Sequence, residues 1–345
     1  MAHGPSPQTC ALSQARHAAQ LPMTRYLFWR IALLALSTLV ASVFIFGVLR
    51  VLPGDVAIAI LGGGGAPHTP EVREALREEL GLNDPLAVQY GRWLWSMANG
   101  EFGGQSLVSG QPIRSLVARQ LPVTLLLALY TVVLSVVVSV PLGVLAVWRW
   151  KRWPDYAVRV VTIVGQAVPN FWVALLIVLG LVVVFRWSPP IVYTHPWEDP
   201  WNHLQIVIWP VLLLAWEYSS HIVRVTRASM LEVLHESYVL TARAKGLPEH
   251  LIIIRHVLRN ALPPTITVMG FQLGALLGGT LILESIFGLP GLGRGLVTAA
   301  LARDYPVVQS LATLLVFAML SINLVIDLVY TIADPRISYS TRSAT

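Results

Sequence analysis

The stretch Gln120–Trp148, QLPVTLLLALYTVVLSVVVSVPLGVLAVW, contains no Asp, Glu, Lys or Arg. A helix of about 20 apolar residues crosses the roughly 30 Å hydrocarbon core of a bilayer, and it satisfies its own backbone hydrogen bonds there. The stretch is longer than any ordinary core strand. It is therefore predicted to be a transmembrane helix.

Other segments of the chain share this property. Four more uncharged stretches qualify outright, at 31–49, 160–185, 260–283 and 306–326. A sixth, near 204–223, reaches spanning length only by taking Glu217 into the membrane. None alternates apolar and polar residues as a membrane β-strand does. With 55% hydrophobic and 12% charged residues, against about 25% charged in soluble domains, the 345-residue chain is predicted to be an all-α integral membrane protein with six transmembrane helices. This composition excludes a soluble enzyme and a disordered chain.

The Lys and Arg residues indicate the orientation of the chain. Fifteen of the 24 lie in the tail, the second and fourth loops and the C-terminal end, whereas the short opposite loops hold only Arg186, Arg294 and Arg303. Because cytoplasmic loops are enriched in basic residues, both termini are expected in the cytoplasm. The net charge of +6 then reflects orientation, since no nucleic-acid motif accompanies it. The polar tail lacks signal-peptide features, so the first span is expected to be uncleaved, with Met23 an alternative start.

The long segment 51–119 between the first two spans carries signals of order. Thr69-Pro70-Glu71 resembles a capped helix start that would run to Gly81, and Asp84-Pro85 begins a second helix rich in aromatic residues. A small helical insertion outside the membrane is therefore predicted. It would be either a packing platform over the bundle or a docking surface for a soluble partner.

The fourth loop, 224–262, is the most informative segment. No helix breaker occurs from Ser220 to Gly246, and Pro248-Glu249 begins another helix that is expected to end at Pro263-Pro264. This pattern predicts a helical hairpin on the cytoplasmic face. The hairpin would either fit into a cleft of a partner protein or be a solvated interfacial helix with ordinary charge pairs.

Several residues within the hairpin and the spans need an explanation. In the hairpin, Glu236 and Arg243 are seven residues apart and would share a helix stripe. An embedded carboxylate is costly, so Glu217 is either a pathway or proton-coupling group, or a residue near the interface, and Asp327 is expected to be satisfied by water or an Arg partner. Small residues recur along the fifth span, and their face is expected to pack against a neighbouring helix. The alternative is that this face forms a sliding contact between helices that opens the pore. The small residues are Gly270, Gly274 and Gly278.

Short motifs distributed along nearly the whole chain support a family resemblance. They are Leu52–Asp55, Gly81–Leu86, Gln120–Thr124, Val168–Phe171, Glu236–Leu247, His256–Leu262, Glu284–Gly293, Arg303–Pro306 and Asp334–Arg336. Together they resemble the permeases of binding-protein-dependent ABC importers, specifically the dipeptide and oligopeptide subgroup. The resemblance implies the type I permease fold, with a cytoplasmic tail 1–24, a first helix 25–50, an extracytoplasmic insertion 51–119, a permease core 120–335 and a tail 336–345.

The same resemblance implies the partners and the mechanism. The chain would be the first of two permease subunits, assembled with two cytoplasmic ABC ATPases and an extracytoplasmic substrate-binding protein, and it would move short peptides by alternating access. Close relatives of the subgroup take up glutathione or nickel complexes as well, so the substrate stays open. ATP and Mg²⁺ would be bound by the partner ATPases, and no cofactor is expected on this chain.

The resemblance also assigns a coupling site that would occupy a cleft of the ATPase. The matching positions are Glu236, Ala242, Arg243, Ala244, Lys245 and Gly246. One departure is notable, because the Glu-Ala-Ala triplet of general importers is replaced by Leu240-Thr241-Ala242, so Glu236 is the predicted acidic contact.

Competing chemistries have weaker support in the sequence. The segment Gly288–Gly295 resembles a phosphate loop only superficially, since Arg294 stands where the lysine should be, and a sharp turn outside the membrane is the better interpretation. The histidines have no metal-ligand spacing, and the single cysteine, Cys10, cannot form an internal disulfide. A proton- or ion-driven carrier and a membrane scaffold remain alternatives; copurification with an ATPase, or uptake abolished by a protonophore, would distinguish these three classes.

Overall fold

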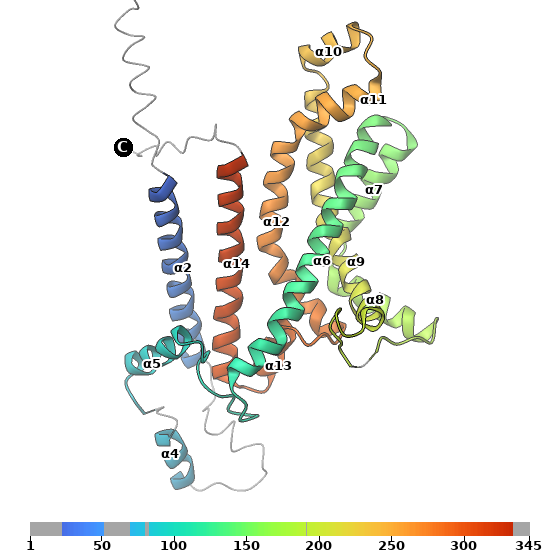
Figure 1. The fold of residues 1–345 in the computed structure, drawn as a ribbon. Coiled ribbons are helices and arrows are strands. Elements are labelled where there is room, and N and C mark those ends of the chain that lie inside the picture. Colours follow the sequence, from blue (N-terminus) through green and yellow to red (C-terminus); the bar gives the residue numbers. More distant parts are fainter. Residues whose placement is uncertain (1–22, 52–69, 80–82, 191, 334–345) are drawn as a thin grey trace, which may run out of the picture.

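The computed structural model describes residues 23–51, 70–79, 83–190 and 192–333. Within them every regular element is a helix (Figure 1). In chain order the helices are α2 (Met23–Val51), α4 (Pro70–Glu79), α5 (Leu86–Ala98), α6 (Ile113–Trp148), α7 (Trp153–Ala167), α8 (Asn170–Val183), α9 (Pro200–Val233), α10 (Ser237–Ala244), α11 (Glu249–Leu251), the π-helical η2 (Ile252–Leu258), α12 (Arg259–Ile286), α13 (Leu292–Leu301) and α14 (Tyr305–Ala333).

The long helices are arranged around α9. Two thirds (67%) of the apolar window of α9 is buried, against 11% for α2 and for α14, so α9 is central and the latter two lie at the periphery. The main core forms where α6, α8, α9 and α12 meet, around fully buried Leu127, Ala174 and Leu214. Figure 1 shows α2 and α14 side by side at one flank.

The two ends of the bundle differ. We call the end that carries α10 and α11 the hairpin end, and the end that carries α5 and α13 the insertion end (Figure 1). Helix α2 starts and α14 finishes at the hairpin end. At this end of the membrane segments Arg30 pairs with Asp327 at 2.8 Å, which confirms that an Arg partner satisfies this acid.

Among the described residues, four helices are individually long and apolar enough to cross a membrane, and six crossings result if each of two bent helix pairs is one span. The predicted span 160–185 is not one straight helix, because α7 and α8 meet at an angle of 100°. Val168 is extended, with φ −93° and ψ 127°. A residue that precedes a proline is driven out of the helical region, and Pro169 follows it.

The hairpin also departs from the prediction at two places. The helix expected from 220 to 246 stops at Val233, and Glu236 is extended before α10 begins. Local propensity favours helix there, but the turn lets α10 fold back onto η2, and the packing gained overrides the propensity.

The second helix does not end at Pro263-Pro264, since α12 continues through both prolines to Ile286. Side-chain donors supplement the backbone around them. Asn260 Nδ2 donates to the His256 carbonyl at 2.7 Å, and Thr265 Oγ1 donates to the Ala261 carbonyl at 3.1 Å. These two bonds reinforce the turns on either side of the prolines, whereas the carbonyls that lose an N–H donor are those of Arg259 and Asn260.

The insertion contains the two predicted helices, of which α4 runs from Pro70 to Glu79, while Gly81 lies outside the described residues. Helix α6 begins at Ile113, before the predicted core boundary at 120. The loop before α6 is tied to the bundle: the Ser106 hydroxyl and the Leu107 N–H both donate to the buried carboxylate of Asp304, which precedes α14. The loop is therefore part of the packed bundle. The tails 1–22 and 334–345 lie outside the described residues.

Candidate functional site

The loop between α9 and α12 forms a projecting hairpin, which we define as residues 234–251 (Figure 1). The backbone of Glu236 is extended, with φ −69° and ψ 143°, and its carbonyl accepts the first hydrogen bond of α10, from Val239 N at 3.0 Å. Gly246 has a φ of +76°, a conformation that glycine adopts without steric cost, and there the chain turns back toward α11.

One face of α10 is buried against the bundle. Val239 is fully buried and Ala242 is 6% exposed, and both pack in a cluster with Met230 of α9 and with Ile252 and Val257 of η2. All three of these partners are fully buried as well. Since protein interiors are close-packed, a displacement of α10 must displace the ends of α9 and η2 with it.

The other face of the hairpin is open. Of the six predicted coupling residues only Ala242 is buried; the exposed ones are Glu236, Arg243, Ala244, Lys245 and Gly246. Large apolar side chains are exposed beside them, namely Tyr238, Leu240 and Leu247. We call these eight exposed residues the outer face. The outer face combines apolar and charged side chains, and the packing of α10 against the bundle does not involve them.

An ion pair that the sequence did not reveal closes the hairpin. Arg243 donates from Nη2 to Glu249 Oε1 at 2.6 Å and from Nε to Oε2 at 3.2 Å. This hydrogen bonding raises the pKa of Arg243 and lowers the pKa of Glu249. The predicted stripe of Glu236 and Arg243 is therefore split, because Glu236 precedes the helix while Arg243 is engaged by Glu249 within the hairpin.

A second ion pair lies between the hairpin and the bundle core. Asp155 of α7 is 1% exposed, and its carboxylate accepts two bonds from Arg227 of α9, from Nε at 2.7 Å and from Nη2 at 3.0 Å. The Lys151 N–H also donates to it at 3.2 Å. Residues 72 positions apart in the chain thus fix α7 to α9 close to the helix end that carries the hairpin.

Glu217 lies where α8 approaches α9. Its carboxylate accepts a hydrogen bond from the side chain of Asn170, the first residue of α8 after the bend at Pro169. The side chain of Glu217 is partly buried. This contact gives Glu217 a partner at the bend, and the pathway role predicted for it stays a prediction.

The glycine stripe of α12 has varied surroundings. Gly274 contacts Asn323 of α14 so closely that a methyl group would overlap the Asn323 amide, whereas Gly278 faces open space and is exposed. Gly270 is buried. Gly279, which the prediction omitted, lies against the hydroxyl of Tyr218 on α9, where a methyl group would come within 2.8 Å.

A buried carboxylate organises the insertion end. Glu284 of α12 is fully buried, and it accepts hydrogen bonds from Thr124 Oγ1 at 2.8 Å, from Gly293 N at 2.7 Å and from Arg294 N at 3.2 Å. The two backbone donors lie in the first turn of α13, where a helix favours a negative charge. The segment predicted as a sharp turn therefore carries the start of a short helix that Glu284 joins to α6 and α12.

The described parts of the chain contain no group of three or more His, Cys, Asp or Glu that could hold a metal ion.

Comparison with known families gives the context of the hairpin. A model described as the binding-protein-dependent transport system inner membrane component matches residues 139–339, and a model of the N-terminal region of such components matches residues 23–128. The chain belongs to this family of transport permeases.

Individual permeases of the family match over most of their length. A putative peptide transport system permease protein of Brucella suis is 40% identical over 317 residues, which cover 92% of this chain and 100% of the relative. The oligopeptide transport system permease protein AppB of Bacillus subtilis is 35% identical over 86% of this chain and 94% of its own length. The glutathione transport system permease protein GsiC of Escherichia coli is 36% identical over 92% of this chain and all of its own length.

A solved structure supports the fold of the permease. The methionine ABC transporter MetNI, in inward-facing conformations, aligns with a TM-score of 0.51 at 17% identity, over 65% of this chain and 98% of the other. This likeness concerns the fold alone. The hairpin lies within the part of the chain that the first family model covers, so its geometry is a feature of a transport permease.

Proposed function

We propose that this chain is one of two permease subunits of an ATP-driven importer of short peptides, crossing the bacterial inner membrane six times. The two bent pairs, α7 with α8 and the segment Glu249–Leu276 with Gly278–Ile286 inside α12, would each be one span. Helix α2 begins and α14 ends at the hairpin end (Figure 1). With the basic residues enriched at this end, both termini and the hairpin would face the cytoplasm, and the insertion would face the delivering binding protein.

The observation that carries the proposal is the outer face. A short helix whose inner side is locked to α9 and η2 presents Glu236, Lys245 and exposed apolar side chains outward. Such a surface suits docking into a cleft of a separate ATPase, because protein interfaces combine apolar and charged side chains. The buried side of α10 would pass a displacement of the hairpin on to α9 and η2. ATP binding would close the ATPase pair, and the hairpin would carry that motion into the spans.

Peptides are the proposed substrate because the Brucella and Bacillus relatives are named as peptide or oligopeptide permeases. Glutathione, itself a short peptide, is an alternative that the Escherichia relative supports. Nickel complexes are a further alternative from the resemblance of the sequence. The extracytoplasmic binding protein would select among them, so binding assays on that partner decide the substrate.

Charge reversal tests the coupling. Glu236→Lys should abolish substrate-stimulated ATP hydrolysis and uptake while the subunit still inserts and assembles in the membrane. Glu232→Lys is the matched control, since Glu232 is also exposed but lies on the last turns of α9 outside the outer face. Unchanged uptake in the Glu236 variant would refute the role of this residue.

One observation favours a second function, a proton-coupled carrier: the partly buried Glu217 carboxylate, which is hydrogen-bonded to Asn170. A carrier of this class would lose uptake on addition of a protonophore and keep it when ATP is depleted. The proposed importer shows the opposite pattern, so the two experiments together separate the functions.

A further inference from the structure

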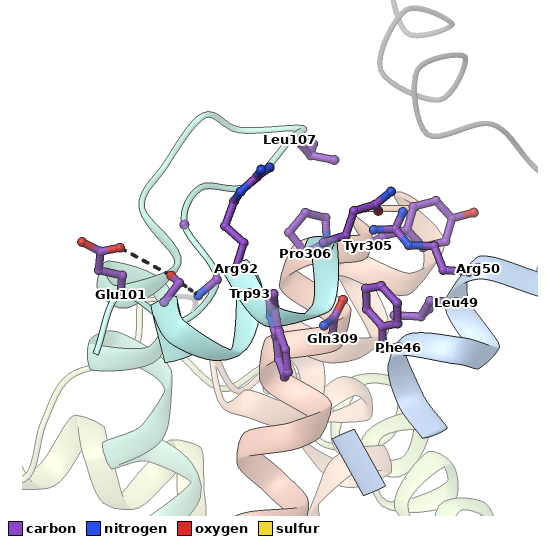
Figure 2. A pocket seen from close by; sticks show the side chains of 14 residues that line it. Phe46, Leu49, Arg50, Arg92, Trp93, Glu101, Leu107, Tyr305, Pro306 and Gln309 are labelled. Carbon is purple, nitrogen blue, oxygen red and sulfur yellow. Dashed lines mark hydrogen bonds between the residues drawn. The ribbon is translucent and has the colours of Figure 1, made fainter. Parts of the chain in front are cut away.

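A cavity lies at the insertion end, on the flank away from the central core (Figure 2). It has a volume of about 350 Å³ and is enclosed by the end of α2, by α5, by the loop that follows α5 and by the start of α14. Its walls are largely apolar, with Phe46, Trp93 and Pro306 among them. Size and lining fall in the range of small-ligand sites, which combine apolar walls with a few polar groups.

Within the described part of the chain, Arg50 has no ion-pair partner and the Gln309 amide has no hydrogen-bond acceptor. The guanidinium of Arg50 lies 5.0 Å from the centre of the Phe46 ring, and no carboxylate of the described residues is within ion-pair distance of it. Gln309 is 6% exposed, and its Nε2 has no hydrogen-bond partner within the described part of the chain. A buried amide donor without an acceptor costs about 1–3 kcal/mol, so the site favours a ligand that supplies oxygen atoms.

Arg92 and Glu101, the other charged residues of the cavity, contact groups other than Arg50. Arg92 pairs with Asp84 at 2.9 Å. The carboxylate of Glu101 is directed toward the Ser96 hydroxyl and away from Arg50 in Figure 2. Among the described residues Arg50 has no carboxylate within ion-pair distance, so the ligand group that complements it is an anion with several oxygen atoms. Phosphate fits, because guanidinium groups bind its oxygens with strong, charge-assisted hydrogen bonds.

The location indicates a lipid. Helix α2 exposes large apolar side chains near the cavity, with Phe44 at 70% and Val40 at 60% exposure, and α5 exposes Trp95 at 70%. Trp and Tyr side chains concentrate at the membrane–water interface, and Arg50 lies in the last turn of the membrane-length helix α2. The substrate route would run through the core helices, whereas this cavity opens beside the lipid-facing flank.

We propose that this cavity binds the phosphate group of a glycerophospholipid. Arg50 and the amide of Gln309 donate to the phosphate oxygens, and the acyl chains lie along the exposed face of α2. The lipid comes from the leaflet at the insertion end, which is the outer leaflet in the proposed orientation. It fastens α2 and the insertion to α14, independently of which substrate is transported.

Retention of lipid by the purified, full-length permease in its native assembly tests the proposal. The permease is delipidated in detergent and incubated with phosphatidylglycerol, or with a phosphate-free diacylglycerol glycolipid of the same chain length, and bound lipid is counted by native mass spectrometry. Arg50→Gln is expected to lower retention of phosphatidylglycerol about tenfold, the worth of one charge-assisted hydrogen bond. Arg114→Gln, an exposed arginine at the start of α6 outside the cavity, should leave retention unchanged.

A second variant and a competitor complete the design. Gln309→Met removes the amide donor at nearly constant length, so it reports on the site if the Arg50 variant fails to assemble. Equal retention in the wild type and in either cavity variant would overturn the proposal. Equal retention of the glycolipid would overturn the phosphate contact, and displacement of the lipid by millimolar inorganic phosphate would identify a site for the free anion instead.

Discussion

Breaking the ion pair between Asp155 and Arg227 should strongly destabilise the permease. The Asp155 side chain is 2% exposed and that of Arg227 is 19% exposed, and two hydrogen bonds of 2.7 and 3.0 Å join them. Asp155→Ala leaves the guanidinium mostly buried without a counter-charge. Removal of one partner of a buried pair typically costs about 3–5 kcal/mol, so we expect a loss of that order in the free energy of unfolding.

A double-mutant cycle measures the coupling. Unfolding of the permease in bicelles by steric trapping would be compared for the wild type, Asp155→Ala, Arg227→Met and the double variant. Arg227→Met should also lower stability, because it strands the buried carboxylate. The double variant should lose clearly less than the sum of the two single losses, since neither charge is then left alone. A cost below about 1 kcal/mol for Asp155→Ala, or strict additivity, would refute the reasoning.

Three further predictions concern the rest of the bundle. Glu284→Gln should lower the free energy of unfolding by about 1–3 kcal/mol in the same assay, because the amide can keep its oxygen toward the Gly293 and Arg294 N–H groups only by turning its NH₂ toward the Thr124 hydroxyl, which now donates to the carboxylate; no loss would contradict the hydrogen-bond network. Gly274→Ala should reduce stability and uptake through overlap with the neighbouring helix, whereas Gly278→Ala, whose added methyl meets open space, should be neutral; equal effects would argue against the close packing. The pKa of Glu249 is lowered in the folded hairpin, so this residue stabilises the fold above its unfolded pKa of about 4.3, and the stabilisation is lost as the pH falls through the folded pKa. Amide hydrogen exchange of α10, corrected for intrinsic rates, should therefore accelerate in that pH window in the wild type. Arg243→Gln should remove this pH dependence.

The sequence predicted the membrane helices well because crossing a bilayer imposes length and composition on each span. Uncharged runs located the main spans, and the sequence also indicated that the Asp327 carboxylate needs water or an Arg partner, which is Arg30 in the structure. Bends were harder to predict, since a proline within an apolar run is compatible with both a kinked helix and a broken one. At Pro169 the chain turns by 100°, whereas at Pro263 and Pro264 the helix continues. Tertiary packing decides between these outcomes.

The resemblance placed Glu236 and Lys245 on the hairpin, and both side chains are exposed there. Their role in coupling stays a prediction. Contacts between distant segments had no signal in the sequence: Asp155 and Arg227 are 72 residues apart, and no local pattern pairs them. Glu249 was visible only as a helix start, although its place six residues after Arg243 now explains how the hairpin is closed.

The most direct test of the proposed function is cross-linking of the outer face to the ATPase in intact membranes. In a Cys10→Ser background, cysteines at positions 236 and 245 should each form a cross-link to the copurifying ATPase subunit, and a cysteine at position 198, at the opposite end of the bundle, should not. The cysteines at positions 236 and 245 should also remain unlabelled when membrane-impermeant thiol reagents are added outside intact cells. Labelling of these positions from outside, or the absence of any ATPase cross-link, would contradict the assignment of the hairpin as the coupling element.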